Sequence, residues 1–364
     1  MLQGIKVIDF TNYLPGPFAT LRLAELGAEI IKVEPPGGDP ARNTGISKQG
    51  EGIVFLANNR QKKSITLNLK EKEDLETALK LIATADVVIE SFRPGVMEKL
   101  CLGYQAVRNV KPDIVYCSIS GYGQNGTHSK LGNHDINYMA LSGVLAQLKD
   151  KAGKPVHPSI PLADYLGGFA ANERILAGLV SKSLTGKGSY HSISITDQLV
   201  SLLGNHIMVE KETGEGTGIN VLNGSIISYA IYETMDGRYM SLGALEQKFW
   251  RNFCLAHWQE GWVEAHFSKT EKTNPVFEEV TALFKSKTFD EWIEFAQKVD
   301  CCMAPVLEVG ELSAHPYFKE KELLFASSWG DYQVKMHSDV EQGTIAPPPK
   351  KGEHQDGILK NILI

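Results

Sequence analysis

Several residues whose side chains move protons stand where helices are predicted to begin. Residues 132–143 read as a loop leading into a helix, with His134 in the loop and Asp135 near the first turn. The backbone amides of such a turn point outward and can stabilise an oxyanion, and a histidine beside them can transfer a proton. Asp164 and Glu246 each stand at the start of a further helical stretch. Each residue also has a plainer interpretation, namely an exposed loop histidine, a helix N-cap and a helix-start carboxylate.

A second group of side chains has the chemistry to hold phosphates. Basic residues fall in or beside the turns that follow predicted strands, at Arg42, Arg60, Lys62, Lys63 and Arg93. Guanidinium and ammonium groups in such turns suit a ligand with several phosphates. For Lys62 and Lys63 a solvated run of surface charge is the alternative. Arg93 differs because its turn follows a strand that is predicted to be buried.

Residues 121–126 match the GxGxxG pattern of dinucleotide-binding loops. That pattern should open a helix and meet an acidic residue at the end of the next strand. Here it leads into another loop at 128–132, so we predict no nicotinamide or flavin site. His128 and His134 lack the spacing and supporting ligands of a metal site, and we predict no metal.

These residues must be positioned by the elements around them, and the N-terminal part alternates strands with helices. Strands are predicted at 5–10, 29–34, 64–69, 86–90 and 113–119, and helices at 19–26 and 72–84. This order indicates an α/β fold with a doubly wound, mainly parallel sheet. Ligands bind beyond the carboxyl ends of such strands, so we expect the site at the turns after Phe10, Glu34, Glu90 and Ile119.

The second half of the chain predicts a long helix and a smaller domain. The helix covers about 164–184, a strand follows at 192–196, and Asp197 is predicted to cap the next helix. The polar, Gly-rich stretch 213–218 indicates a linker. A hairpin at 228–242 and helices near 273–285 and 289–299 then predict an α+β domain.

Composition limits the class of protein. A chain of 364 residues exceeds the size of a typical single domain, so we expect two. The formal net charge of -6 offers no general attraction to nucleic acid or to an anionic membrane. Five Cys without a CxxC pair argue against a disulfide framework. No apolar run approaches the length of a membrane span, and no export signal is evident, so we expect a cytoplasmic protein that acts on a small molecule.

Taken together, these features resemble the family III CoA-transferase (CaiB/BaiF) superfamily over essentially the whole chain, and most of all its α-methylacyl-CoA racemase branch. The resemblance is carried by residues 4–9 with 15–17, 25–34, 59–69, 92–95 and 185–188. It implies an interlaced homodimer with a Rossmann-like large domain and a small domain. We expect the large domain at 1–205 with 325–364, a linker at 206–224 and the small domain at 225–324.

The resemblance also implies roles for individual residues. Arg42, Lys63 and Arg93 are expected to contact the nucleotide and phosphates of CoA, and Asn59, Arg60 and Tyr138 complete the expected CoA-binding set. Asp164 matches the residue that both branches place at the reacting centre. No cofactor beyond the CoA moiety of the substrate is expected, and neither nucleic acid nor a membrane is an expected partner.

The two branches differ in what surrounds that aspartate. In transferases it is a nucleophile, shielded by a Gly-rich loop, whereas the segment around Glu246 contains Gly243 but no glycine run. Racemases place a histidine 30 residues before the aspartate, as His134 stands before Asp164. Both departures favour the racemase branch.

The chemistry that follows is the interconversion of (2R)- and (2S)-2-methylacyl-CoA. One of His134 and Asp164 would remove the α-proton and the other would return one to the opposite face of a planar enolate. Amides near Asp135 would stabilise the enolate oxygen, and Glu246 of the other chain would orient His134. The alternative is a CoA-transferase that forms an Asp164 acyl-enzyme, and a non-catalytic CoA-binding protein is a third possibility.

Overall fold

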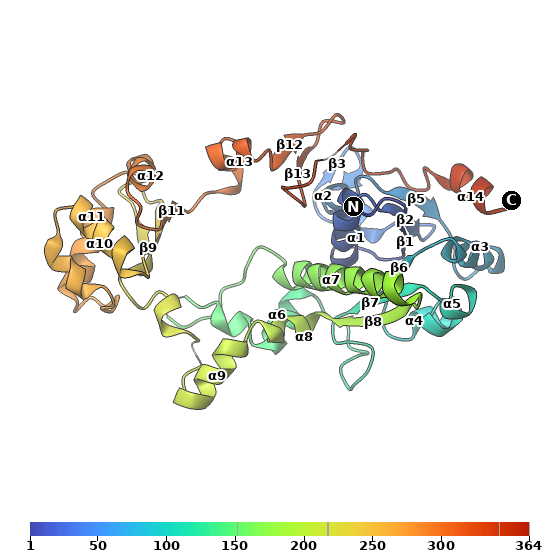
Figure 1. Cartoon of the computed structure of the whole chain (residues 1–364), viewed down its shortest axis with the longest axis horizontal. Coiled ribbons are helices and arrows are strands. Elements are labelled where there is room, and N and C mark those ends of the chain that lie inside the picture. The colour runs from blue at the N-terminus through green and yellow to red at the C-terminus, as the bar shows by residue number, and fades with distance from the viewer. Residues whose placement is uncertain (151, 217, 342, 364) are drawn as a thin grey trace. The chain divides into compact units, whose positions relative to one another are not determined.

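The chain folds into two compact units, described here from a computed structural model. The structure describes residues 1–150, 152–216, 218–341 and 343–363. Unit 1 comprises Met1–Leu203 with Tyr317–Ile364, and unit 2 comprises Gly204–Pro316. Figure 1 labels the elements of both units.

The centre of unit 1 is a six-stranded parallel sheet with the order β5-β2-β1-β6-β7-β8. Its strands are β1 Lys6–Asp9, β2 Glu29–Glu34, β5 Lys63–Thr66, β6 Val87–Glu90, β7 Val115–Ser120 and β8 Ser189–Ser194. The chain builds outward from β1 through β2 to β5, and then returns to build the other way from β6. The winding therefore reverses between β1 and β6, where a doubly wound sheet opens a crevice for a ligand. The predicted α/β class with a central parallel sheet is confirmed.

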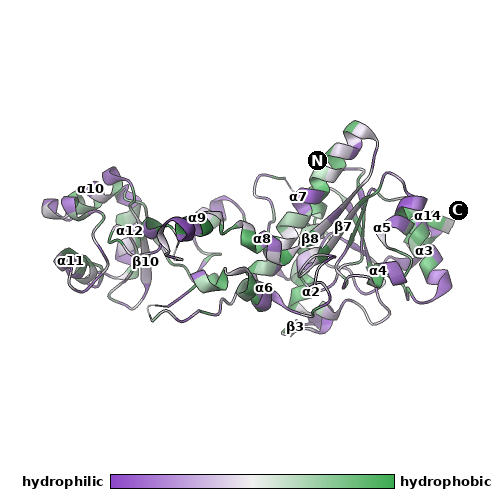
Figure 2. Ribbon diagram, turned by 90° about the horizontal axis from the view of Figure 1, so that it is seen from below, coloured by the Kyte–Doolittle hydropathy of each residue, from purple (hydrophilic) through white to green (hydrophobic). Residues whose placement is uncertain are grey.

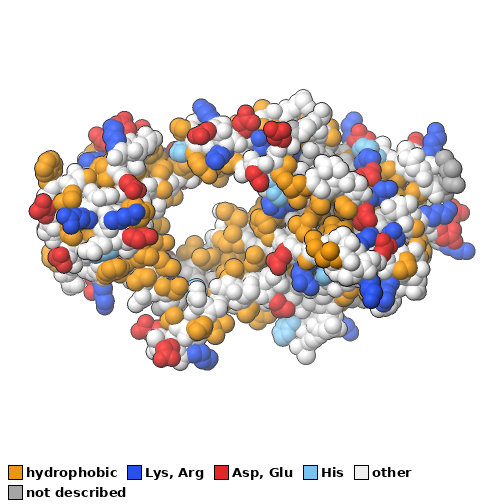
Figure 3. Space-filling model, viewed as in Figure 1, with side chains coloured by type: hydrophobic (Ala, Val, Ile, Leu, Met, Phe, Trp, Pro, Cys, Tyr) orange, Lys and Arg blue, Asp and Glu red, His pale blue; other side chains and the backbone are white. Residues whose placement is uncertain are grey.

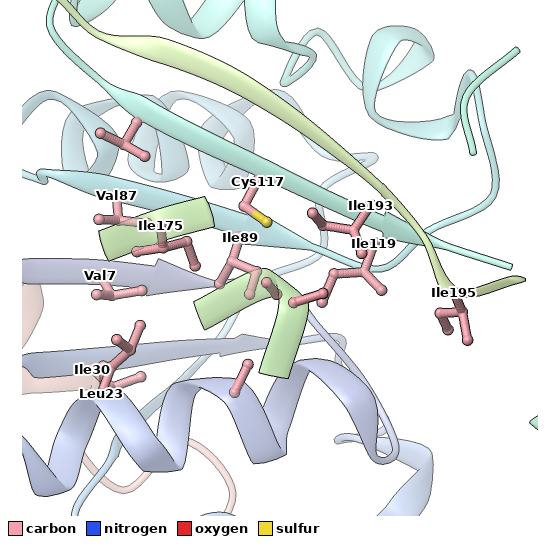
Figure 4. Close-up of a cluster of buried hydrophobic side chains, with 14 of the residues drawn as sticks. Val7, Leu23, Ile30, Val87, Ile89, Cys117, Ile119, Ile175, Ile193 and Ile195 are labelled. Atoms are coloured by element: carbon pink, nitrogen blue, oxygen red, sulfur yellow. The ribbon is translucent and has the colours of Figure 1, made fainter. Parts of the chain in front are cut away.

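Helices cover both faces of this sheet, because successive side chains of a strand point to opposite sides. On one face, Val7 and Ile89 pack with residues of four helices, among them Ile175 (Figure 4). These are α1 Pro15–Glu25, α6 Asp135–Ser142, α7 Leu162–Thr185 and α8 Ile195–Ser201. On the other face, Ile8 and Val88 pack with residues of α3 Lys72–Ala83, α4 Val96–Lys99, α5 Tyr104–Val110 and α14 Gln355–Leu363.

Hydropathy follows the same layering. In Figure 2, α3 and α14 carry both hydrophobic and hydrophilic residues, as expected for helices with one buried face. Smaller elements complete unit 1: α2 Ile53–Asn58, the pairs β3 Ser47–Lys48 with β4 Glu51–Gly52 and β12 Leu324–Ala326 with β13 Tyr332–Val334, and most of α13 Pro316–Glu320.

Two helix starts differ from the sequence-based expectation. Helix α1 begins at Pro15, four residues before the predicted 19, because proline lacks only an N–H that the first helical turn does not need. The predicted cap Asp197 lies inside the first turn of α8. The cap is Ser194, whose side chain accepts a hydrogen bond from the Asp197 amide.

Unit 2 contains an antiparallel sheet with helices packed against it. The sheet has the order β11-β10-β9, from Met303–Pro305, Tyr239–Gly243 and Tyr229–Glu233. Its helices are α9 Gly204–Thr213, α10 Gln247–Ala256, α11 Pro275–Phe284 and α12 Phe289–Lys298. The sheet packs against α10, α11 and α12, whereas α9 has no buried residue. The core is rich in aromatic rings, with Trp250, Phe253, Phe284 and Trp292 fully buried.

No helix among the described residues is both long and apolar enough to span a bilayer. On the face shown in Figure 3, basic and acidic side chains are interspersed over each unit rather than gathered by sign. All five cysteine thiols are free.

Candidate active site

A cleft of about 830 Å³ lies in unit 1 at the carboxyl ends of the strands. The cleft is lined by the turns after β1 and β6, the end of β7, and the starts of α6, α7 and α8. The lining residues are 12–15, 91–94, 119–121, 129, 131–134, 137, 138, 164 and 195, together with Val54. The turns after β1 and β6 meet where the winding of the sheet reverses. Both turns were predicted from the sequence to border the site, but no functional residue was predicted in the turn after β1.

His134 and Asp164 line this same cleft. His134 is the N-cap residue of α6, is exposed, and its backbone amide donates to Asn137 Oδ1 at 3.1 Å. Asp164 is the third residue of α7 and is partly buried. Since α7 begins at Leu162, Asp164 is not its cap, and the plainer interpretation of this residue is wrong.

Asp135 ties the starts of α6 and α7 together. Its Oδ2 accepts a hydrogen bond from the Asp164 amide at 3.0 Å. Because His134 directly precedes Asp135, this bond fixes the backbone of both predicted proton-transfer residues relative to each other. Helix ends need such partners, since their first amides have none within the helix.

Burial, followed by the negative charge of Asp135, raises the pKa of Asp164 to about 7. A carboxyl group with this pKa is present in both protonation states near neutral pH. It can therefore accept and donate a proton under the same conditions, as a general acid and base must.

Tyr138 forms one side of the cleft and depends on a glycine opposite. Its hydroxyl donates to the Asn133 carbonyl at 2.8 Å. A Cβ atom at Gly121 would overlap the Tyr138 ring, so only glycine leaves room for it. Burial, followed by the charge of Asp164, raises the pKa of the Tyr138 phenol to about 12. The phenol therefore stays neutral and can donate.

Arg93 supplies the positive charge of the cleft. It is exposed, and its guanidinium lies so close over Gly132 that a Cβ there would be 2.5 Å from Nη2. Within the described residues Arg93 forms no ion pair, which leaves its donors available to an anionic ligand.

The other residues of the expected CoA-binding set lie outside this cleft. Arg42 pairs with Glu34 at 2.7 Å and with Glu51 at 3.0 Å. Arg60 is fully buried against Glu25, and Lys63 pairs with Glu29 at 2.5 Å. These cations are paired with carboxylates of the same chain, and the CoA contacts expected of them stay predictions.

Asn59 and Lys62 belong to the same buried region. Lys62 is 2% exposed and donates to Asn59 Oδ1 at 2.8 Å, so the interpretation of Lys62 as a solvated surface charge is wrong. Burial lowers the pKa of Lys62 to about 7 despite the nearby carboxylate of Asp9. The sequence shows basic residues in post-strand turns but not the acidic partners that tertiary folding brings to them.

Glu246 lies in unit 2, directly before α10. It occupies the N-cap position, but its side chain does not cap the helix, and its carboxylate is exposed. Among the described residues, no group of three or more His, Cys, Asp or Glu side chains is arranged to hold a metal ion.

Known proteins of two activities resemble this chain. It is 31% identical to the human succinyl-CoA:glutarate CoA-transferase, over 100% of the chain and 86% of that protein. It is 30% identical to the human α-methylacyl-CoA racemase, over 99% of the chain and 93% of that protein. A crystal structure of a CaiB/BaiF family protein from Brucella suis superposes with a TM-score of 0.86 at 25% identity, covering 99% of both chains. Residues 2–355 match the sequence model of CoA-transferase family III. The chain therefore belongs to the family III CoA-transferase (CaiB/BaiF) superfamily, which includes both CoA-transferases and α-methylacyl-CoA racemases.

Proposed function

We propose that the protein is an acyl-CoA racemase or epimerase that interconverts (2R)- and (2S)-2-methylacyl-CoA. One observation carries this proposal: His134 and Asp164 line the same cleft, and the Asp135 side chain binds the start of one helix to the start of the other. Inversion next to a thioester carbonyl needs two proton-transfer groups at one carbon. A non-catalytic protein has no need of that arrangement.

In the proposed reaction, one group removes the α-proton and the other returns a proton to the opposite face. The intermediate is a planar enolate, and the first-turn amides of α6 beside Asp135 are suited to hold its oxygen. Removing one such preorganised donor typically costs about 3 kcal/mol of transition-state stabilisation. His134 and Asp164 exchange their roles when the substrate has the opposite configuration.

Substrate binding in this proposal relies on the CoA moiety. Arg93 is the cleft residue suited to a CoA phosphate, and Tyr138 lines the same cleft, where the charges of both Arg93 and Asp164 act on its phenol. No further cofactor is needed, because the thioester itself acidifies the α-carbon. We also propose that Glu246 of a second chain, in an interlaced homodimer, hydrogen-bonds His134 and sets its tautomer.

A CoA-transferase is the second candidate, favoured by the same aspartate in the cleft. Relatives of both activities have similar identity to the chain, so the comparisons favour neither. Two features favour the racemase. A pKa near 7 leaves much of Asp164 protonated and therefore a poor nucleophile at neutral pH, and residues 243–247 contain no glycine run to shield an acyl-enzyme.

The test is proton NMR of (2R)- or (2S)-2-methylacyl-CoA with the protein in deuterium oxide, without an acceptor acid. Wild type is expected to exchange the α-proton and scramble the stereochemistry, whereas His134→Ala and Asp164→Asn are not. If nothing exchanges until a free carboxylic acid is added, and CoA then passes to that acid, the protein is a transferase. Hydroxylamine would in that case cleave an anhydride or thioester of Asp164, an intermediate that a racemase does not form.

A further inference from the structure

The turn between β1 and α1 forms one wall of the cleft, and side chains from other segments hold its backbone. Three consecutive residues are involved, Thr11, Asn12 and Tyr13. The Thr11 carbonyl accepts from Lys32 Nζ at 2.7 Å, and the Asn12 amide donates to Ser91 Oγ at 3.2 Å. The Tyr13 amide donates to Asp39 Oδ1 at 3.1 Å. Three side chains from outside the turn therefore each bind one of its backbone groups and hold its main chain in place.

Two of these partners form a buried ion pair. Lys32 Nζ lies 2.8 Å from Asp39 Oδ2, and both side chains are 0% exposed. Burial alone would lower the pKa of Lys32, but the carboxylates of Asp9 and Asp39 outweigh it and raise the pKa, so the ammonium stays charged. Breaking one partner of a buried pair leaves an uncompensated charge, so the pair resists displacement.

The backbone of Tyr13 needs this support. Its φ is 62°, in the left-handed region that side chains other than glycine rarely adopt. Asp39 Oδ1 accepts from both the Tyr13 and the Ala41 amides, and so joins this unfavourable conformation to the helical turn that begins at Pro40. Strained residues that the surrounding structure maintains cluster at ligand sites.

The conformation places an apolar ring at the cleft. Tyr13 lines it and remains 50% exposed, beside the apolar cleft residues Leu14, Pro15 and Val54. The charged groups of the lining come from other segments, namely Arg93 from the turn after β6, and His134 and Asp164 from the starts of α6 and α7. The cleft therefore offers separate surfaces to an anionic group and to an apolar chain.

We propose that Tyr13 contacts the acyl chain of the substrate, and that Lys32 and Asp39 are positioning residues that hold it there. This inference rests on the proposal that the cleft binds an acyl-CoA. It does not depend on whether the reaction is racemisation or CoA transfer, because both bring an acyl thioester to the cleft.

The first experiment measures binding by calorimetry, with free CoA and with 2-methylacyl-CoA of short and long chains. Tyr13→Gly suits the left-handed backbone and removes the whole side chain. We expect it to weaken the long-chain ligand on the order of tenfold and to leave free CoA unchanged. Equal weakening of free CoA, or no change with any ligand, would overturn the acyl contact. Failure of wild type to bind either CoA or acyl-CoA would instead contradict the proposed function.

The second experiment tests whether Asp39 acts through Tyr13. Asp39→Asn keeps an oxygen for the two amides but removes the charge that pairs with Lys32. In an otherwise unchanged protein, Asp39→Asn should raise the KM for the long-chain substrate. In a Tyr13→Gly background it should raise that KM much less, because the effects of coupled residues are not additive. Effects of equal size in both backgrounds would mean that Asp39 is merely structural.

Asp86→Asn is the matched control. Asp86 combines the same two roles directly before β6, at the amino ends of the central strands, accepting from the Lys6 amide at 3.0 Å and from Lys182 Nζ at 2.8 Å. It should reduce stability without changing KM. If Asp86→Asn raises KM as much as Asp39→Asn does, the positioning role is wrong.

Discussion

Among single residues, Asp164 lies in an environment that favours proton transfer near neutral pH but lowers the stability of the folded protein there. Burial, with the charge of Asp135, raises its pKa from 3.8 to about 7. The unfolded chain therefore loses this proton at a lower pH than the folded chain does. The contribution of Asp164 to stability is most favourable where both states are protonated, falls as the pH rises from about 4 to about 7, and then stays level.

Asp164→Asn should consequently be inactive but more stable than wild type at pH 8. The amide resembles the protonated carboxyl in shape and charge, so the gain should shrink as the pH falls toward 4. Urea denaturation at several pH values measures it. A variant less stable than wild type at pH 8 would contradict the pKa assigned to Asp164. Exposed Asp150 is the control, because Asp150→Asn should show no such trend.

Residue types and positions pointed to Arg93, His134 and Asp135, the family resemblance added the roles of Asp164 and Tyr138, and the structure brings all five to one cleft or its immediate border. They share a local signal, since each lies just beyond a predicted strand or at a helix start. Arg42 and Arg60 share that signal but are buried in ion pairs. Their partners Glu34 and Glu25 lie 8 and 35 residues away in the sequence, and the sequence pattern does not identify which cation each carboxylate will neutralise.

At the scale of elements, the packing of α6 against the end of β7 controls where Tyr138 lies. Gly121 follows β7 directly, and a Cβ atom there would overlap the ring of Tyr138 in α6. Gly121→Ala should displace the ring and raise KM for acyl-CoA, with a stability loss of about 1–3 kcal/mol from overpacking.

Steady-state kinetics and thermal denaturation check this prediction. Gly37→Ala is the matched control, because no atom lies within 4 Å of the added methyl group. Replacing Tyr138 by a smaller residue in the Gly121→Ala background should recover the lost stability but not the affinity. An unchanged KM for Gly121→Ala would mean that Tyr138 does not contact the substrate.

Element types and order followed from the sequence more readily than element ends did. Strand–helix alternation predicted the parallel sheet, because buried parallel strands read as short apolar runs. The start of α1 was misplaced because Pro15 and Pro17 look like a break, although both fit a first helical turn. Likewise Ser194 and Asp197 are both good caps, and only the backbone geometry distinguishes them.

At the scale of the whole molecule, the proposed site needs residues from both units, since His134 belongs to unit 1 and Glu246 to unit 2. In the proposed interlaced dimer, each site takes these two residues from different chains. Symmetry then makes both sites identical, and a mutation in either residue damages both sites of a homodimer. His134→Ala and Glu246→Ala should each be nearly inactive on their own.

A heterodimer of these two variants distinguishes the arrangements. If the site is shared, one site combines both mutations, while the other takes intact His134 from one chain and intact Glu246 from its partner. Co-expression with two different affinity tags, followed by sequential purification, should therefore restore about half of the wild-type activity per dimer, because one of two equivalent sites is whole. If Glu246 instead serves His134 of its own chain, every site carries one mutation and the heterodimer stays as inactive as its parents. A Glu246→Ala homodimer with full activity would remove Glu246 from the mechanism altogether, and leave the orientation of His134 to its hydrogen-bonded position at the start of α6.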